Sequence, residues 1–317
     1  MKKKEKMSPH IIAVAAFVVF IVLGLACAST KAVKSAASID EVTGLANKLT
    51  WLKANAKSGG NYILEVNANE SMIGSDIFAG NLSYKNESNI TITIKGVGEN
   101  RTISLISAGY LFRVGSGVTL ILDENITLKG FKVTNLMDVS STRSVVSVDG
   151  TLVMNDGATI TGGMNNFDNG GGVYVFSGGT FLMKGGTIAG NTCFPTADAA
   201  AVASSKGEYT NMYDPGTYKG AGVYVVESTA DSKNLWDKLS KNKSGGTFTK
   251  TGGTIYGYTG DSNGNVVRDF GGQNVLQNHG HAVYAGSERD NKRKEATAGP
   301  EVNLHYSDGE FSGDWDF

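Results

Sequence analysis

Hydrophobic residues between positions 38 and 57 recur at intervals of three and four residues. The set is Ile39, Val42, Leu45, Ala46, Leu49 and Leu52, and this spacing places its members on one face of an α-helix. Ser38, followed three residues later by Glu41, is a capping-box pattern, and Gly59-Gly60 would end the helix. The pattern therefore predicts one amphipathic helix near 38–57.

After this segment the hydrophobic period changes to two. Ile90, Ile92 and Ile94 alternate with polar residues, which is typical of a β-strand with one buried face. From Leu111 onward a triplet recurs whose first and third residues are hydrophobic. Its copies are Phe112-Arg113-Val114, Val146-Ser147-Val148, Val173-Tyr174-Val175, Val223-Tyr224-Val225 and Val283-Tyr284-Ala285. Because successive strand residues face opposite sides, we expect the outer residues of each triplet to point inward and the middle residue outward.

A second part of the repeat begins with threonine. Its copies start at Thr119, Thr151, Thr180 and Thr247, and each is followed seven or eight residues later by another threonine and a hydrophobic residue. Each unit therefore contains three short strands in about 27 to 35 residues, a length that fits one coil of a solenoid. Lys250 falls at an inward position of this repeat, and the pattern gives no reason for it.

One such unit cannot bury its own hydrophobic face. Units stacked about 4.8 Å apart share backbone hydrogen bonds and a continuous core. A propeller would need four antiparallel strands per blade, and that rhythm is missing. The sequence therefore predicts an all-β protein built as a parallel β-helix.

The open strand edges of such a stack would template aggregation and need a cover. We expect the segment 38–60, with its helix, to cap one end and the charged and aromatic tail 291–317 to cover the other. The β-helix itself is expected over 61–290. Insertions interrupt it at 192–221, 226–244 and 257–280.

Residues 1–26 have the pattern of a signal sequence. Lysines precede an uncharged hydrophobic run from Ile11 to Ala26. A helix of that length would reach about 24 Å, short of a hydrocarbon core of about 30 Å, so a cleaved signal is favoured over a permanent membrane anchor. Leu25-Ala26-Cys27 resembles the cleavage motif of bacterial lipoproteins, which implies lipidation of Cys27, a linker over 27–37, and a lipid-anchored protein of the cell envelope, at the outer membrane or cell surface. An ordinary secreted protein with a chance cysteine is the alternative.

The amino-acid composition excludes several classes of protein. The 42 glycines come with only 4 prolines, which excludes collagen. The hydrophobic content of 40% and the net charge of −1 exclude a disordered chain and provide no basic excess for nucleic acid. Lipidation of Cys27 would leave Cys193 without a disulfide partner and would exclude a cysteine-based metal cluster. We expect a monomer without cofactor or metal.

The repeat also resembles a known family. Its Gly-Val-Tyr-Val and Gly-Gly-Thr units look like those of right-handed, pectate-lyase-like β-helices in surface lipoproteins and adhesin-like proteins. Gly171-Gly172-Val173-Tyr174 and Ile188-Ala189-Gly190-Asn191 are similar to the GGA[I/V] and FxxN repeats of polymorphic outer-membrane protein passengers, with Ile188 in place of Phe. Those passengers carry a C-terminal membrane barrel. Too little chain follows Tyr284 to build such a barrel, so we expect lipid on Cys27 to anchor the protein instead. The resemblance covers about 61–290 and implies a scaffold, which can host many functions.

A polysaccharide lyase or glycoside hydrolase on this scaffold would need carboxylates gathered on one exposed face. Asp123, Glu124 and Asp156 occupy equivalent turns of neighbouring units and can approach one another. Aspartate in turns more commonly caps backbone groups. A catalytic role for these carboxylates is therefore the enzymatic alternative.

Two weaker patterns resemble metal sites. The run from Asp261 to Asn265 places oxygen donors at alternate positions, as at the start of a calcium loop, but Val266 replaces the required glycine and Gly272 the closing glutamate. An Asn/Gly turn is the simpler interpretation. His279 and His281 are two residues apart, and no third zinc ligand is placed by the sequence.

The middle residues Tyr174, Tyr224 and Tyr284 should form one outward column. Such a ladder stabilises neighbouring strands, and it can also bind a sugar or a partner protein. Long loops on a rigid scaffold concentrate binding residues, which makes Trp236 in the insertion 226–244 a candidate anchor. We therefore expect a non-enzymatic, adhesin-like protein that binds a host or environmental glycan or protein. A purely structural envelope protein is the second alternative.

Overall fold

The computed structural model describes residues 38–74, 80–133, 142–166, 169–194, 218–226, 245–258, 261–268, 280–285, 294–298 and 301–306. The chain divides into two compact units, Met1–Ala56 and Lys57–Phe317. Among the described residues, no helix combines the length and the hydrophobicity needed to cross a membrane.

The helix of the first unit begins later than predicted. A 3-10 turn, η1 (Ile39–Glu41), precedes the α-helix α2 (Leu45–Asn55). The hydroxyl of Ser38 accepts a hydrogen bond from the backbone N–H of Asp40 at 3.2 Å, so this side chain caps η1. Val42 is extended, and Gly44 with a φ of 78° is the N-cap of α2. The prediction of one helix over 38–57 was therefore too long, because the first turn is a separate element. The role of this segment as an end cap stays a prediction.

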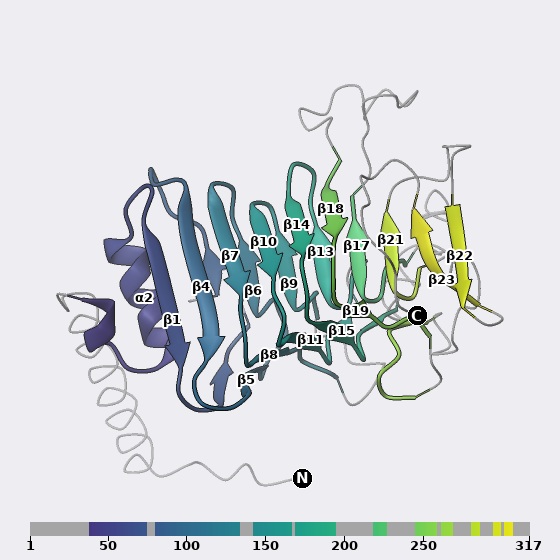
Figure 1. Ribbon diagram of the computed structural model, residues 1–317, viewed down its shortest axis with the longest axis horizontal. Helices are drawn as coiled ribbons and strands as arrows, with labels where there is room; N and C mark the ends of the chain where they lie inside the picture. Colours follow the sequence, from purple (N-terminus) through teal and green to yellow (C-terminus); the bar gives the residue numbers. More distant parts are fainter. Residues whose placement is uncertain are drawn as a thin grey trace, which may run out of the picture. The chain divides into compact units, whose positions relative to one another are not determined.

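The second unit is a parallel β-helix, which confirms the predicted fold class. Its strands lie in four sheets, each of which takes strands from successive coils. In Figure 1 the strands of sheet A stand side by side in chain order. Sheet A consists of β1 (Asn61–Val66), β4 (Ile90–Gly96), β7 (Val118–Leu122), β10 (Thr151–Met154), β14 (Thr180–Met183) and β18 (Thr247–Lys250). Sheet B consists of β2 (Glu70–Met72), β5 (Arg101–Leu105), β8 (Ile126–Lys129), β11 (Ala158–Thr161), β15 (Thr187–Ala189) and β19 (Thr254–Ile255).

The other two sheets complete the coils. Sheet C consists of β3 (Asn81–Leu82), β6 (Phe112–Val114), β9 (Val146–Val148), β13 (Val173–Val175), β17 (Val223–Val225), β21 (Val283–Ala285), β23 (Glu301–Tyr306) and β22 (Lys294–Ala298). Sheet D consists of β12 (Met164–Asn165), β16 (Thr192–Cys193) and β20 (Val266–Val267). The predicted coil of three strands therefore gains a short fourth strand in three coils. The edge of β21 in sheet C is occupied by β23, which pairs with it in parallel, and β22 pairs antiparallel with β23.

The first valines of the triplets form one buried row. Val146, Val173, Val223 and Val283 are paired in register on neighbouring strands, and all four are fully buried. The predicted inward row is therefore confirmed. Complete burial of one such side chain contributes about 1.5 to 3 kcal/mol, and the register repeats this contribution in these four coils.

Lys250 points into the interior, as the repeat predicts, and only 2% of its surface is exposed. It follows Met154 and Met183 in one in-register column of sheet A. Its strand β18 is the last of that sheet. The methylene stem of the lysine therefore continues the packing surface of the two methionines at the end of their column.

A ladder of buried asparagines connects three coils. The Oδ1 atom of Asn191 accepts the backbone N–H of Gly163 at 2.8 Å. Its Nδ2 donates to Oδ1 of Asn265 at 2.9 Å, and to the carbonyl oxygens of Ala189 and Ile160 at 3.1 and 3.3 Å. The backbone N–H of Asn191 also donates to Oδ1 of Asn265. These bonds satisfy polar groups that have no access to water.

The glycines before the triplets make room for this ladder. A Cβ atom at Gly172 would lie 3.0 Å from Nδ2 of Asn191, and one at Gly222 would lie 3.0 Å from Nδ2 of Asn265. The Gly-Val-Tyr-Val part of each of these repeats is therefore coupled physically to the asparagine that follows it.

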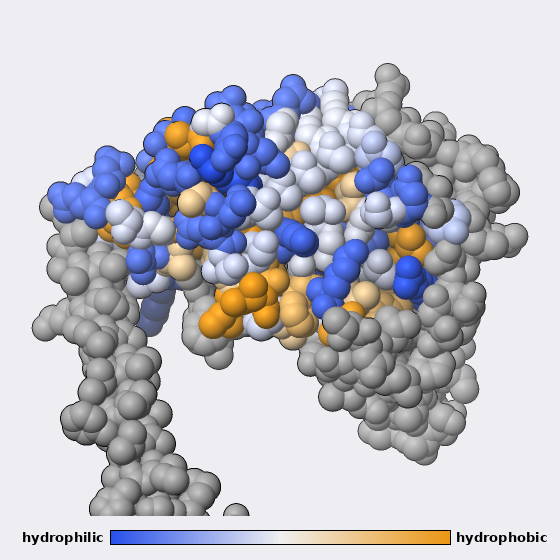
Figure 2. Space-filling view, turned by 90° about the horizontal axis from the view of Figure 1, so that it is seen from below, coloured by the Kyte–Doolittle hydropathy of each residue, from blue (hydrophilic) through white to orange (hydrophobic). Residues whose placement is uncertain are grey.

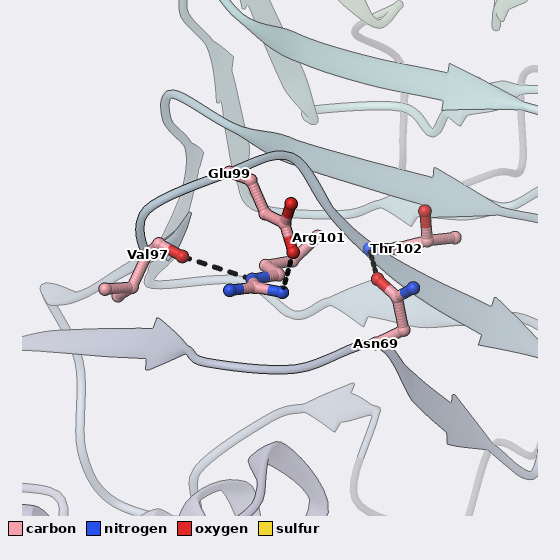
Figure 3. Close-up of polar contacts among 5 residues, drawn as sticks. All are labelled: Asn69, Val97, Glu99, Arg101 and Thr102. Carbon is pink, nitrogen blue, oxygen red and sulfur yellow. Dashed lines mark hydrogen bonds and ion pairs between the residues drawn. The ribbon is translucent and has the colours of Figure 1, made fainter.

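A polar corner between β4 and β5 shows how neighbouring coils are joined (Figure 3). Nε of Arg101 donates to the carbonyl oxygen of Val97 at 3.1 Å, and its guanidinium pairs with the carboxylate of Glu99. The side chain of Asn69, from the loop between β1 and β2, accepts the backbone N–H of Thr102 at 2.8 Å. The corner of one coil is thereby bonded to the corner of the previous one.

Candidate functional site

The three tyrosines predicted to form a column do lie next to one another. Tyr174, Tyr224 and Tyr284 are paired in register at the middle positions of β13, β17 and β21. The ring centroids of Tyr174 and Tyr224 are 5.1 Å apart, and those of Tyr224 and Tyr284 are 5.8 Å apart with ring planes 8° from parallel. Both distances are in the range of favourable aromatic contacts.

The exposure of the column differs from the prediction at one end. Tyr174 and Tyr224 are partly exposed, whereas Tyr284 is buried with 2% of its surface accessible. Nζ of Lys219 lies 4.3 Å from the ring centroid of Tyr284 and donates a hydrogen bond to its hydroxyl at 2.7 Å. The expectation of an accessible contact residue was therefore wrong for Tyr284, whose buried ring contacts Lys219 and Tyr224.

Phe176 adds a third ring to the accessible end of the column. It lies two residues after Tyr174 on the same face, with ring centroids 4.4 Å apart, and it is partly exposed. The guanidinium carbon of Arg113 lies 5.9 Å from the Phe176 centroid, and Nε of Arg113 pairs with Oδ2 of Asp149 at 3.1 Å. We call Arg113, Asp149, Tyr174, Phe176 and Tyr224 the aromatic platform.

Sequence reasoning missed Phe176 and the Arg113–Asp149 pair. The register contains a signal for the pair, since Arg113 is the middle residue of the β6 triplet and Asp149 follows the β9 triplet. Ser147, the middle residue between Arg113 and Tyr174, is fully buried. A small residue there leaves room for the larger side chains of the neighbouring coils to approach each other.

The aromatic platform can bind a ligand in two ways. Aromatic side chains have few rotatable bonds, so they lose little conformational entropy when their apolar faces contact a ligand. The Arg113–Asp149 pair is partly exposed and offers donors and acceptors for hydrogen bonds. Such a combination of flat apolar surface with a few polar groups is typical of sites that bind sugars or protein side chains.

The predicted carboxylates lie at turns. The Oδ1 atom of Asp123 accepts a hydrogen bond from Nδ2 of Asn155 on the next coil at 3.1 Å. Glu124 and Asp156 follow these two residues, so they occupy equivalent positions on neighbouring coils, and both are exposed. The structure therefore brings Glu124 and Asp156 to the same turn column and gives Asp123 a structural partner.

The run from Asp261 to Asn265 is a turn, and its last residue faces the interior. Oδ1 of Asp261 accepts the backbone N–H of Asn263 at 2.8 Å. Asn265 is buried, and its Nδ2 donates to the carbonyl oxygens of Ile188 and Tyr256. The calcium-loop interpretation is therefore wrong for Asn265, because its amide belongs to the asparagine ladder.

His281 has a structural role in the described part of the chain. It is buried, and its Nδ1 accepts the backbone N–H of Val267 at 3.0 Å. His279 lies outside the described residues. Across the residues that the structure describes, no group of three or more His, Cys, Asp or Glu side chains is placed to hold a metal ion.

Two of the predicted site residues, Cys27 and Trp236, lie outside the described residues. Cys193 is buried in a small core cluster with Tyr218, Ala221 and Val267, and its Sγ donates to the carbonyl oxygen of Lys219 at 3.6 Å. This thiol therefore helps to fix the backbone of Lys219, whose side chain contacts Tyr284.

Comparison with known proteins gives no family or relative. No family model matches the chain, and neither a curated protein nor a solved structure is significantly similar to it.

Proposed function

We propose that this protein is a non-enzymatic β-helix, displayed at the cell surface, that binds a glycan or a protein in an adhesin-like manner. The observation that carries the proposal is the aromatic platform. Tyr174 contacts both Phe176 and Tyr224, and all three rings are partly exposed on one rigid sheet. The charged pair of Arg113 and Asp149 lies beside them.

The rigidity of the scaffold supports a binding role. The tyrosines are fixed in register by the backbone pairing of β13 with β17, and their neighbours on the inner face are fully buried valines. A preorganised site loses little entropy when a ligand binds. A sugar ring or an aromatic or aliphatic side chain fits this surface, since either can stack on the exposed rings.

A glycan and matrix-protein binding array tests the proposal. The full-length chain should bind one class of ligand, and Tyr174→Ala and Phe176→Ala should each weaken binding by about tenfold, the equivalent of about 1.4 kcal/mol. Tyr256→Ala is the matched control, because Tyr256 is also a partly exposed tyrosine but follows β19 on another sheet. Equal losses in the control and in the platform variants would contradict the proposal. An array without any ligand would favour a purely structural envelope protein.

We further propose that lipid on Cys27 holds the protein at the cell envelope, at the outer membrane or cell surface, after removal of residues 1–26 as a signal peptide. The supporting pattern is the hydrophobic run that ends in Leu25-Ala26-Cys27. Labelling with a radioactive fatty acid should mark the wild-type protein and leave Cys27→Ser unmarked. Label that persists in the variant would contradict lipidation at this residue.

Carbohydrate cleavage is the second candidate function. It is supported by the exposed carboxylates of Glu124 and Asp156 at equivalent positions of neighbouring coils. Shortening of a polysaccharide by the wild-type protein, abolished by Glu124→Gln or Asp156→Asn, would establish this function over the binding role. Tyr174→Ala should then alter substrate binding without removing cleavage.

A further inference from the structure

The three rings of the aromatic platform do not share one plane. The ring of Tyr174 is tilted by 43° against that of Phe176 and by 47° against that of Tyr224. A flat aromatic ligand can therefore lie parallel to only one ring of each pair at a time. A puckered ring that carries C–H groups on both faces can contact neighbouring rings of different tilt, and a sugar ring has this shape.

One carboxylate oxygen of the platform is left for a hydrogen-bond donor. Nε of Arg113 donates to Oδ2 of Asp149 at 3.1 Å, whereas Oδ1 of Asp149 has no hydrogen-bond partner among the residues that the structure describes. The side chain of Asp149 is 31% exposed. Because an ionised carboxylate only accepts hydrogen bonds, this oxygen selects a ligand group that donates one, such as a hydroxyl.

The register places this carboxylate beside the rings. Asp149 directly follows β9 and Phe176 directly follows β13, and the two strands pair in register. The backbone N–H of Phe176 donates to the carbonyl oxygen of Val148 at 2.9 Å. Asp149 and Phe176 therefore occupy equivalent positions of neighbouring coils, about 4.8 Å apart. A ligand that packs on the ring of Phe176 is within reach of the carboxylate.

The charges of the platform cancel one another. Arg113 and Asp149 form an ion pair, so together they present no net charge that would attract an anion, and the second carboxylate oxygen repels one. The guanidinium carbon of Arg113 lies 5.9 Å from the centroid of Phe176, where a cationic ligand would otherwise contact the ring. The arrangement therefore favours an uncharged ligand over an anionic or a cationic one.

We propose that the aromatic platform binds an uncharged glycan and that Asp149 determines this specificity. The sugar ring packs its C–H groups against Tyr174 and Phe176, and one of its hydroxyl groups donates to Oδ1 of Asp149. Arg113 is the positioning residue that holds the carboxylate in this orientation. The inference rests on the binding role proposed above and selects a glycan over a protein, because a stable protein interface takes about 20 to 30 residues a side and the platform consists of far fewer.

Hydrophobic side chains elsewhere on the molecule provide a control for unspecific adsorption. Figure 2 shows such side chains beside hydrophilic ones on the face that carries sheet B. Ile73 and Ile106, which follow β2 and β5, are 59% and 55% exposed. These strands belong to sheet B, whereas the platform lies on sheet C. Ile106→Ser therefore removes exposed hydrophobic surface without changing the platform.

Isothermal titration of the full-length chain tests the specificity, with cellohexaose, mannohexaose and chitohexaose as uncharged probes and hexagalacturonate as the acidic probe. We expect saturable binding of at least one uncharged probe and no binding of hexagalacturonate. Asp149→Asn should weaken binding of the uncharged probe about tenfold, because hydrogen bonds to charged groups are stronger than those to neutral ones. The same variant should admit hexagalacturonate, because Arg113 loses the carboxylate that neutralises it. Arg113→Gln should weaken binding of the uncharged probe without admitting the acidic one.

The change of ligand class separates recognition from stability, since a variant that merely misfolds does not gain an acidic ligand. Equal losses of binding in Asp149→Asn and Ile106→Ser would overturn the inference, as would wild-type binding of hexagalacturonate as tight as that of the uncharged probes. Binding of a matrix protein and of no uncharged glycan, lost in Tyr174→Ala, would overturn the glycan specificity and retain the binding role. Absence of any glycan or protein ligand would overturn both.

Discussion

The asparagine ladder gives the most specific prediction about stability. Asn191 receives the backbone N–H of Gly163 from the preceding coil and donates to Asn265 of the following coil. Its side chain is fully buried. Replacement by alanine removes these bonds without adding bulk, so Asn191→Ala isolates the contribution of the ladder.

The magnitude follows from the groups that lose their partners. In Asn191→Ala the buried backbone N–H of Gly163 has no acceptor, which lowers the free energy of unfolding by about 1 to 3 kcal/mol. The carbonyl oxygens of Ile160 and Ala189 lose one donor each, and Oδ1 of Asn265 retains the backbone N–H of residue 191. We therefore expect a loss of about 3 kcal/mol in the free energy of unfolding. For a chain of 317 residues that loss lowers the melting temperature by about 4 to 5 °C.

Thermal and urea unfolding, followed by circular dichroism, measure this loss. Asn263→Ala is the control, because Asn263 is an exposed residue of a turn, and a substitution there should change stability by less than about 0.5 kcal/mol. Hydrogen exchange should locate the weakening in the coils of β11, β15 and β19, since solenoid stability is a sum of contributions between neighbouring coils. Equal stability of Asn191→Ala and Asn263→Ala would refute the reasoning.

Two further predictions concern a glycine and a carboxylate. Gly172→Ala should destabilise the fold by about 1 to 3 kcal/mol in urea unfolding, because the new Cβ would lie 2.6 Å from the carbonyl oxygen of Gly222; an unchanged urea midpoint would contradict this. The carboxylate of Glu87 accepts hydrogen bonds from the hydroxyl and the backbone N–H of Ser58, and these bonds lower its pKa below 4.5. They stabilise the fold above pH 4.5 and are lost as the pH falls through the lowered pKa, so the urea midpoints of wild type and Glu87→Gln should differ at pH 7 and converge in acid. A difference between the two urea midpoints that persists in acid would show that it does not come from the ionised carboxylate of Glu87.

The repeat made most of the fold predictable. Because a strand alternates its faces with a period of two, a triplet with hydrophobic ends determines which side chains point inward. When the same triplet returns in successive coils, parallel pairing in register places identical side chains next to one another, as the valines of β9, β13, β17 and β21 show. The inward position of Lys250 was predictable for the same reason. The start of α2 was not, because the capping signal at Ser38 serves the separate turn η1.

The candidate site was predictable only in part. The sequence placed Tyr174, Tyr224 and Tyr284 in one column, since their positions in the triplet are identical. It gave no sign that Lys219 contacts Tyr284, because that contact joins residues separated by an insertion of irregular length. The contact between Phe176 and Arg113 was not predicted, because the two residues lie on different coils and do not occupy equivalent positions of the repeat.

By itself, the sequence determined the parallel stacking of the coils, the inward rows and the column of tyrosines, because these depend only on periodicity and on the identity of side chains at equivalent positions. The tertiary structure alone decided which of those tyrosines stays accessible and how the asparagines bond between coils. These features depend on lateral distances between side chains of different coils. A periodic sequence determines the register of its strands, but not the path by which each loop returns or the contacts that side chains make across the register.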